Sequence, residues 1–255
     1  MKLITTYLTD VGIEKKYNQD SLCLQVASTS IGKIVLCVVC DGMGGLEKGE
    51  LASSSVVFAF KQWFSQDLPQ ILLETDINDE ICYQWKRIIK EQNQRINVYG
   101  KQNGIQLGTT VTALLMFETG QLLIGHVGDT RVYRISSRIE QMTEDQTVVN
   151  MEVNRGALTI EQAELDPRRN VLLQCVGSSK TVEPEFIVDE VHKNETYLVC
   201  SDGFRHKISS AEIFSSFEPS KIINTEMLEI EIKAVFEEIK KRGETDNITA
   251  VVIRT

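Results

Sequence analysis

Five aspartates stand at the edges of apolar segments in this sequence. Asp41, Asp129 and Asp202 follow such a segment, whereas Asp20 and Asp246 precede one. A carboxylate at the end of a buried strand is costly to desolvate unless a cation or hydrogen-bond donors compensate for it, and several carboxylates brought together repel one another. One such aspartate is more often a turn or cap residue. Five in the same setting predict a cation site.

The absence of His and Cys from this set indicates which cation it would take. Oxygen ligands alone favour hard divalent ions, Mg²⁺ or Mn²⁺, that keep several waters. Five ionised carboxylates carry a charge of −5, and two or three divalent ions would turn such a site into one that attracts phosphate. The glycines of Asp41-Gly42-Met43-Gly44-Gly45 would let the backbone approach an ion or anion, although a tight strand-to-helix turn explains them equally.

The elements that would position these aspartates are mainly strands. Glu118-Thr119-Gly120 lies between two apolar runs and predicts a hairpin, and therefore antiparallel pairing. Apolar and β-branched runs predict strands at Leu3–Leu8, Leu22–Val26, Lys33–Cys40, Thr110–Phe117, Gln121–Val127, Arg131–Ile135, Phe186–Val188, Thr196–Cys200 and Ile248–Ile253.

Three segments predict helices that pack one apolar face on a sheet. They are Leu51–Phe64, the stripe from Ile81 to Ile96, and the stripe from Leu228 to Ile239. The segment Thr143–Gly177 differs, because capping boxes at Thr143 and Thr159 and a stop at Gly156 divide it into short pieces. We expect it to form a flap.

Composition limits the class of protein. With 255 residues, 42% hydrophobic and 25% charged, and no linker-like stretch, we expect one domain over residues 1–255. The net charge of −9 argues against nucleic acid and anionic membranes as partners, and no apolar run could span a bilayer. We expect a cytoplasmic protein. Cys37 and Cys40 have zinc-like spacing but no second pair, so we favour buried thiols over a zinc site.

The order of short motifs resembles a known family. The motifs are Asp10-x-Gly12, Asn18-Gln19-Asp20, Asp41-Gly42-Met43-Gly44-Gly45, Gly108-Thr109-Thr110, Gly128-Asp129-Thr130-Arg131, Ser201-Asp202-Gly203 and Thr245-Asp246-Asn247-Ile248-Thr249. Together they resemble the metal-dependent Ser/Thr protein phosphatases of type 2C, in their compact bacterial form, over about residues 5 to 253. The resemblance implies an α+β fold, a β-sandwich of two antiparallel sheets flanked by helices on both faces, with metals in a cleft at one end.

The resemblance also implies a role for each aspartate. Asp41 would bridge two Mn²⁺ or Mg²⁺ ions, the Gly42 carbonyl and a water held by Asp20 would complete the first ion, and Asp202 with Asp246 would hold the second. Asp129 and Asp202 would supply a third, weaker site. A water bridging the two core ions would hydrolyse phosphoserine and phosphothreonine in proteins. The implied catalytic residues are Asp20, Asp41, Asp202 and Asp246.

Several residues depart from the family pattern or lie beside it. Lys15 stands where an arginine usually clamps the substrate phosphate, and lysine offers a point charge without a bidentate fork; a merely solvated Lys15 is the alternative. Met43, in the glycine-rich motif, has no acidic proton and therefore cannot act as a general acid. We interpret His126 as a core histidine and Arg131 as a support of the Asp129 loop through a salt bridge, and we give His192 and His206 no role.

Three functions remain open at this point. The first is the protein phosphatase, a monomer acting on phosphorylated proteins, including a Ser/Thr kinase and its targets, with residues 145–177 as the flap that selects them. The second is a catalytically weak regulator that only binds phosphoproteins, motivated by Lys15. The third is a two-metal phosphatase of small molecules, since a fold does not fix its substrate.

Overall fold

Ten of the strands in the described residues pair into two antiparallel sheets of five strands each, and two short strands pair with each other. The computed structural model describes residues 3–44, 48–74 and 76–255. The first sheet contains, in order, β1 (Ile4–Asp10), β12 (Ile248–Arg254), β11 (Thr196–Cys200), β8 (Arg131–Ile135) and β9 (Ile139–Gln141). The second contains β10 (Glu185–Glu190), β7 (Gln121–Val127), β6 (Val111–Phe117), β3 (Gly32–Cys40) and β2 (Ser21–Thr29).

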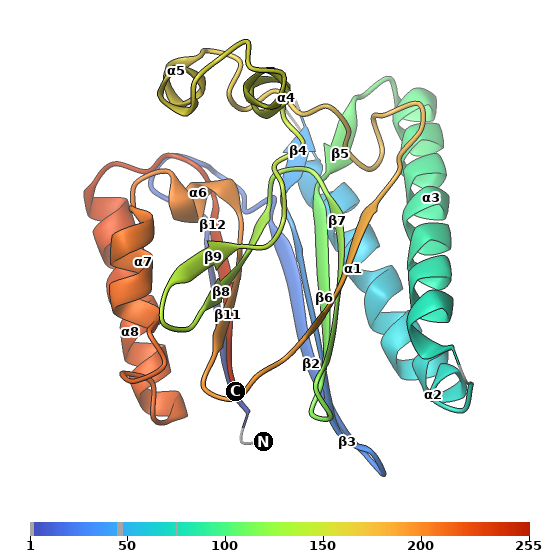
Figure 1. Ribbon diagram of the computed structural model, residues 1–255. Helices are drawn as coiled ribbons and strands as arrows, with labels where there is room; N and C mark the ends of the chain where they lie inside the picture. Colours follow the sequence, from blue (N-terminus) through green and yellow to red (C-terminus); the bar gives the residue numbers. More distant parts are fainter. Residues whose placement is uncertain (1–2, 45–47, 75) are drawn as a thin grey trace.

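Helices cover the outer face of each sheet, as Figure 1 shows. On one side lie α1 (Gly49–Gln66), α2 (Leu68–Ile71) and α3 (Ile77–Asn103), and on the other α6 (Asp202–Arg205), α7 (Ser210–Phe217) and α8 (Thr225–Lys241). The short helices α4 (Val148–Asn154) and α5 (Ile160–Leu165) lie at the end of the sandwich that is remote from the two termini. The expected α+β sandwich is therefore confirmed.

Strand β3 explains why the sequence has continuous apolar runs. Val35, Cys37 and Val39 pack between the two sheets, while Ile34 and Cys40 pack under the helices, because successive side chains of a strand point to opposite faces. A sheet buried on both faces needs apolar residues at every position. Cys37 and Cys40 lie on opposite faces, as expected of buried thiols.

The helical stripes are confirmed, with each stripe facing a sheet. Helix α8 begins after Asn224, whose side chain accepts a hydrogen bond from the Met227 N–H, and its five stripe residues from Leu228 to Ile239 are all buried. In the described part of the chain, no helix is both long and apolar enough to cross a membrane.

Two expectations about local structure need correction. Thr143 caps no helix, because its hydroxyl accepts the Val132 N–H at 3.0 Å; α4 begins instead after Thr147, which accepts from the Asn150 N–H. The capping box at Thr159 is present as expected. The sequence analysis also missed three strands of three residues each, which are too short for a periodic signal: β4 (Gly42–Gly44), β5 (Leu107–Thr109) and β9.

Candidate functional site

The strand registers bring the five aspartates to one end of the sandwich. Ser21 of β2 pairs with Cys40 of β3, so Asp20 and Asp41 lie beside each other at the same end of the sheet. Cys200 pairs with both Ala250 and Arg131, so the segments carrying Asp202, Asp246 and Asp129 also meet there. The structure thus assembles the set that the sequence analysis singled out.

Hydrogen bonds from two threonines fix the backbone of Asp41. The Asp41 N–H donates to the Thr110 hydroxyl at 2.9 Å, and the Asp41 carbonyl accepts from the Thr110 N–H and the Thr109 hydroxyl, each at 2.9 Å. The Thr110 hydroxyl also bonds that of Thr130, at 2.7 Å. The structural role expected for Gly108-Thr109-Thr110 is therefore to hold Asp41 by its backbone, which leaves the carboxylate free for other partners.

Glycines let the aspartate loops approach one another closely. A Cβ on Gly42 would lie 2.3 Å from the Gln19 carbonyl oxygen, and one on Gly203 would lie 2.1 Å from the Asn247 carbonyl oxygen. Real Cβ atoms do not approach backbone that closely, so only glycine fits at either position. Gly45, the last residue of the glycine-rich motif, lies outside the described residues.

Asn247 ties the N-terminal loop to the last strand. Its Oδ1 accepts the Gln19 N–H at 2.8 Å, and its Nδ2 donates to the carbonyls of Val11 and Tyr17 at 2.9 and 3.2 Å. This holds the segment from 11 to 19 over the site.

Lys15 lies in that tethered segment and reaches the aspartates. Its Nζ lies 3.0 Å from Asp246 Oδ1, and 43% of its side chain is exposed. Burial lowers the pKa of Lys15, but the hydrogen bond and charge of Asp246 and the charges of Asp41 and Asp202 outweigh burial and raise that pKa overall. Lys15 is therefore part of the charged cluster and not a side chain free in solvent.

The negative charge of the carboxylate cluster exceeds what the nearby cations and hydrogen-bond donors compensate. Burial, with added repulsion from Asp202, raises the pKa of both Asp20 and Asp129 to about 7. Burial and the charge of Asp20 raise the pKa of Asp41 well above its usual value. Asp20 Oδ2 and Asp202 Oδ1 are buried and have no hydrogen-bond partner among the described residues. Buried carboxylate oxygens without donors are costly, which is the condition a bound cation relieves.

The donor set suits Mg²⁺ or Mn²⁺, since it consists of carboxylate and carbonyl oxygens. Within the described residues, no three His, Cys, Asp or Glu side chains stand in a ready ligand arrangement around one point. The aspartates are neighbours whose charges interact, and the unpartnered oxygens of Asp20 and Asp202 are the atoms that fit a divalent ion.

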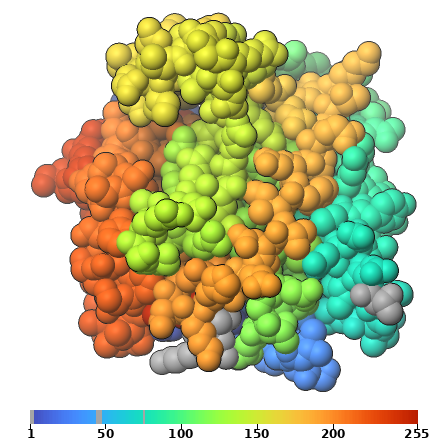
Figure 2. Space-filling model, in the orientation of Figure 1, coloured from blue at the N-terminus to red at the C-terminus, as the bar shows by residue number. Residues whose placement is uncertain are grey.

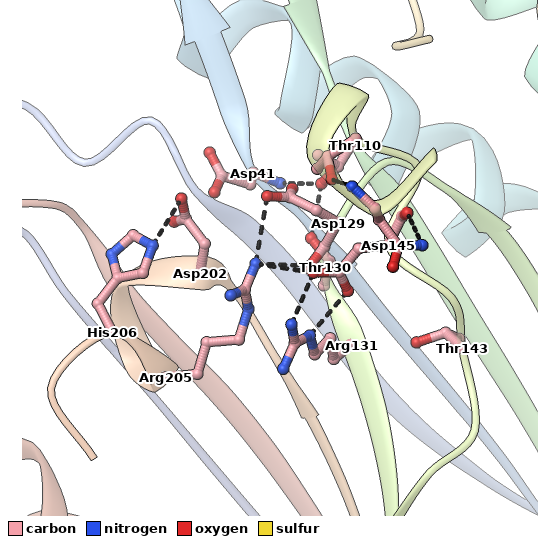
Figure 3. A network of polar contacts seen from close by, with 12 residues as sticks. Asp41, Thr110, Asp129, Thr130, Arg131, Thr143, Asp145, Asp202, Arg205 and His206 are labelled. Carbon is pink, nitrogen blue, oxygen red and sulfur yellow. Dashed lines mark hydrogen bonds and ion pairs between the residues drawn. The ribbon is translucent and has the colours of Figure 1, made fainter. Parts of the chain in front are cut away.

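Two arginines, Arg131 and Arg205, lie beside the cluster and pair with its acids or with Asp145. Arg131 forms the expected salt bridge, and its partner is Asp145, to whose two carboxylate oxygens it donates at 2.7 Å each. Arg205, which the sequence analysis missed, lies between Asp129 and Asp145, as Figure 3 shows. Arg205 comes three residues after Asp202 on α6, so helical spacing was the one available signal.

The histidines divide between core and site. His126 is buried as expected, with Nδ1 2.9 Å from the Thr112 hydroxyl and Nε2 3.1 Å from the Glu144 carbonyl. His206, to which the sequence analysis gave no role, lies with Nε2 3.4 Å from Asp202 Oδ2 and Nδ1 3.5 Å from Glu244 Oε2. It sits one helical turn after Asp202, on the side away from Arg205 in Figure 3.

A cavity of about 710 Å³ is lined by Arg205 and His206, which contact Asp129 and Asp202 of the cluster. Its walls come from the segment 145–177 and from the chain around α6 and α7, and it includes Arg205, His206, Val149 and Ile160. Figure 2 shows the middle of the segment 145–177, in yellow, projecting above the rest of the surface.

Comparisons with known proteins agree on one family. The family model described as Protein phosphatase 2C matches residues 13–235. Protein phosphatase PhpP of Streptococcus pneumoniae is 30% identical over 210 residues, which are 81% of this chain and 80% of that protein. The solved structure of serine/threonine phosphatase Stp1 from Staphylococcus aureus has a TM-score of 0.83 at 28% identity and covers 100% of this chain and 96% of its own. The catalytic domain of serine threonine protein phosphatase PstP in complex with 2 manganese ions has a TM-score of 0.77 at 26% identity, with 99% of each chain covered.

Proposed function

Because the chain belongs to the protein phosphatase 2C family, we propose that its five clustered aspartates hold the divalent ions with which it removes phosphate from phosphoserine and phosphothreonine in proteins. The protein is thus a metal-dependent hydrolase of phosphoric monoesters. The observation that carries the proposal is the pair of buried carboxylate oxygens without donors, Asp20 Oδ2 and Asp202 Oδ1, next to other carboxylates of raised pKa.

Each aspartate has a proposed place in that centre. Asp41, the Gly42 carbonyl and, through water, Asp20 would hold one core ion, and Asp41, Asp202 and Asp246 would hold the other. Asp129 and Asp202 would hold a third ion more weakly. The manganese pair reported for a relative of the same fold supports two core ions, with Mn²⁺ or Mg²⁺ as the candidates. When bound, the ions supply a water of lowered pKa and neutralise charge on the phosphoryl group.

The residues of this chain supply position and charge. Thr109 and Thr110 hold Asp41 by its backbone, so its carboxylate needs no reorganisation to accept an ion. Lys15 lies in the loop that Asn247 tethers, next to Asp246. There it supplies a positive charge that attracts the phosphate of a substrate bound at the cluster. Because an ammonium cannot form the two parallel bonds of a guanidinium, it orients that phosphate less strictly.

We place the whole chain, residues 1–255, in one phosphatase domain, with residues 145–177 as the flap that contacts protein substrates. The cavity between the flap and α7 supports this, because its lining includes Arg205 and His206, which contact Asp129 and Asp202, and has apolar and charged groups on both walls. We further propose a monomer that acts in the cytoplasm on phosphorylated proteins, a Ser/Thr kinase and its targets among them.

Phosphate release from a phosphothreonine peptide tests the proposal. We expect release with Mn²⁺ or Mg²⁺, none with chelator, and a loss of at least a hundredfold in Asp202→Asn, about the scale of removing one electrostatic group from an active site. Asp67→Asn is the matched control, because Asp67 is exposed at the far end of α1. Full activity in a folded Asp202→Asn protein would refute the metal centre.

The same assay separates the two alternatives. Folded wild-type protein that binds the phosphopeptide without releasing phosphate would be a regulator. Preference for a nucleotide or phosphodiester over the phosphopeptide would make it a phosphatase of small molecules.

A further inference from the structure

Arg205 lies where two carboxylates of the site face each other. Its Nη2 is 3.3 Å from Asp129 Oδ2, 3.4 Å from the Asp129 carbonyl oxygen and 3.4 Å from Asp145 Oδ2. Only 16% of the Arg205 side chain is exposed, against 7% for Asp129 and 13% for Asp145. One guanidinium nitrogen is thus shared by two nearly buried acids.

Asp145 and Asp129 differ in the cations that they pair with besides Arg205. Asp145 accepts two 2.7 Å bonds from Arg131, which is the strong bidentate arrangement. For Asp129, the ion pair recorded in the described part of the chain is the one with Arg205. Asp202 adds further negative charge nearby. The charges of Arg205 and, to a smaller extent, Arg131 both act on Asp129, and Arg205 is the cation that contacts it.

The contact between Arg205 and Asp129 is loose. Neither of its two distances, 3.3 Å to Oδ2 and 3.4 Å to the carbonyl oxygen, reaches the 2.7–2.9 Å of a good charge-assisted hydrogen bond. Arg205 Nε is buried and lacks a hydrogen-bond partner among the described residues. A divalent ion carries twice the charge and coordinates carboxylate oxygen directly, so it can displace such a guanidinium.

We propose that Arg205 is a positioning residue that acts as a built-in cation at Asp129 and connects this carboxylate to Asp145 at the base of the flap. The inference rests on the proposed metal centre. A third ion at Asp129 and Asp202 binds only by displacing Arg205 from Asp129. Arg205 then pairs with Asp145 only. Occupancy of the third site and the packing of the flap base are thereby linked.

Titration calorimetry with Mn²⁺ tests the competition. Arg205→Met keeps the apolar stem and removes the charge, so we expect the weakest Mn²⁺ site to bind about tenfold more tightly, with the tighter sites unchanged. Arg205→Lys, which restores a point charge, should lie between wild type and Arg205→Met. The matched control is Arg134→Met, since Arg134 is equally buried (20% exposed) and also lies between two acids, Glu140 and Asp189. Equal weak-site affinity in all four proteins would overturn the inference.

Hydrogen exchange in chelator tests the link to the flap without any metal. We expect amides of residues 143–150 to exchange faster in Arg205→Met than in wild type, with Arg134→Met unchanged; equal exchange in wild type and Arg205→Met would overturn the link. If wild type binds no Mn²⁺ at all, the proposed metal centre fails and the competition with it. If the tight sites fill normally but the weak site ignores Arg205, only the present inference fails.

Discussion

The side-chain oxygen of Asn247 accepts a hydrogen bond from the backbone N–H of Gln19 at 2.8 Å, across 228 residues of sequence. This bond places Asp20, the next residue, against the segment that carries Asp246. The amide of the same side chain holds the carbonyls of Val11 and Tyr17, on either side of Lys15. One nearly buried side chain therefore joins the first and last motifs of the chain.

Replacement of Asn247 should weaken both fold and catalysis. Asn247→Ala leaves the Gln19 N–H and the Val11 carbonyl without their partners, so we expect a loss of about 3 kcal/mol in the free energy of unfolding and at least a tenfold lower kcat/KM. Urea unfolding and phosphopeptide kinetics measure the two effects. Asn103→Ala, at the exposed end of α3, should change neither by more than experimental error. An unchanged Asn247→Ala would show that the bond is not needed.

Lys15 should act on substrate binding. Lys15→Met removes the positive charge next to Asp246, and we expect KM for a phosphothreonine peptide to rise about tenfold while the protein remains folded. Lys15→Arg restores the charge and adds a bidentate fork, so its KM should fall to the wild-type value or below. Lys16→Met serves as the control because Lys16 is exposed. Equal KM in Lys15→Met and Lys16→Met would mean that Lys15 pairs with Asp246 without acting on the substrate.

His206 should stabilise the metal-binding orientation of Asp202. Its ring lies between Asp202 and the nearly buried Glu244, and groups that hold a ligand in place commonly contribute 10- to 100-fold to metal affinity. We expect His206→Ala to need about tenfold more Mn²⁺ for half-maximal activity than wild type. His206→Gln should recover part of this loss of affinity. His192→Ala, in an exposed position, provides the comparison. The role is excluded if His206→Ala and His192→Ala require the same Mn²⁺ concentration.

His126 should make stability fall in mild acid. Burial lowers the pKa of His126 to about 4, although the Glu144 carbonyl and the charge of Asp145 act in the opposite direction. Between pH 6.5 and 4 the unfolded chain therefore binds a proton that the folded chain does not. The contribution of His126 to stability is complete above pH 6.5 and declines as pH falls, by about 1.4 kcal/mol at pH 5.5.

Urea unfolding at pH 7.5 and 5.5 checks this dependence. The difference in unfolding free energy between the two pH values should be about 1.4 kcal/mol smaller in His126→Gln than in wild type. The comparison within each protein removes the constant cost of the substitution itself. Identical pH dependence in both proteins would contradict a neutral buried His126.

Much of this protein could be predicted from its sequence, because the relevant signals are local. The strands of five or more residues and the three long helices follow from the spacing of apolar residues along them, as in β3 and α8. The aspartates at strand ends pointed to a cation site because burying a charge is costly wherever it occurs. Their motif order indicated the family, and the fold followed from that resemblance.

The tertiary structure alone decided which charged groups meet. Arg131 and Arg205 differ by 74 positions, yet both contact Asp145, a shared partner that nothing in the sequence indicated. Thr143, His206 and the three-residue strands were likewise misjudged or missed. An ion pair or a single hydrogen bond depends on where loops end in space and leaves no period in the sequence, whereas burial of an element repeats along it.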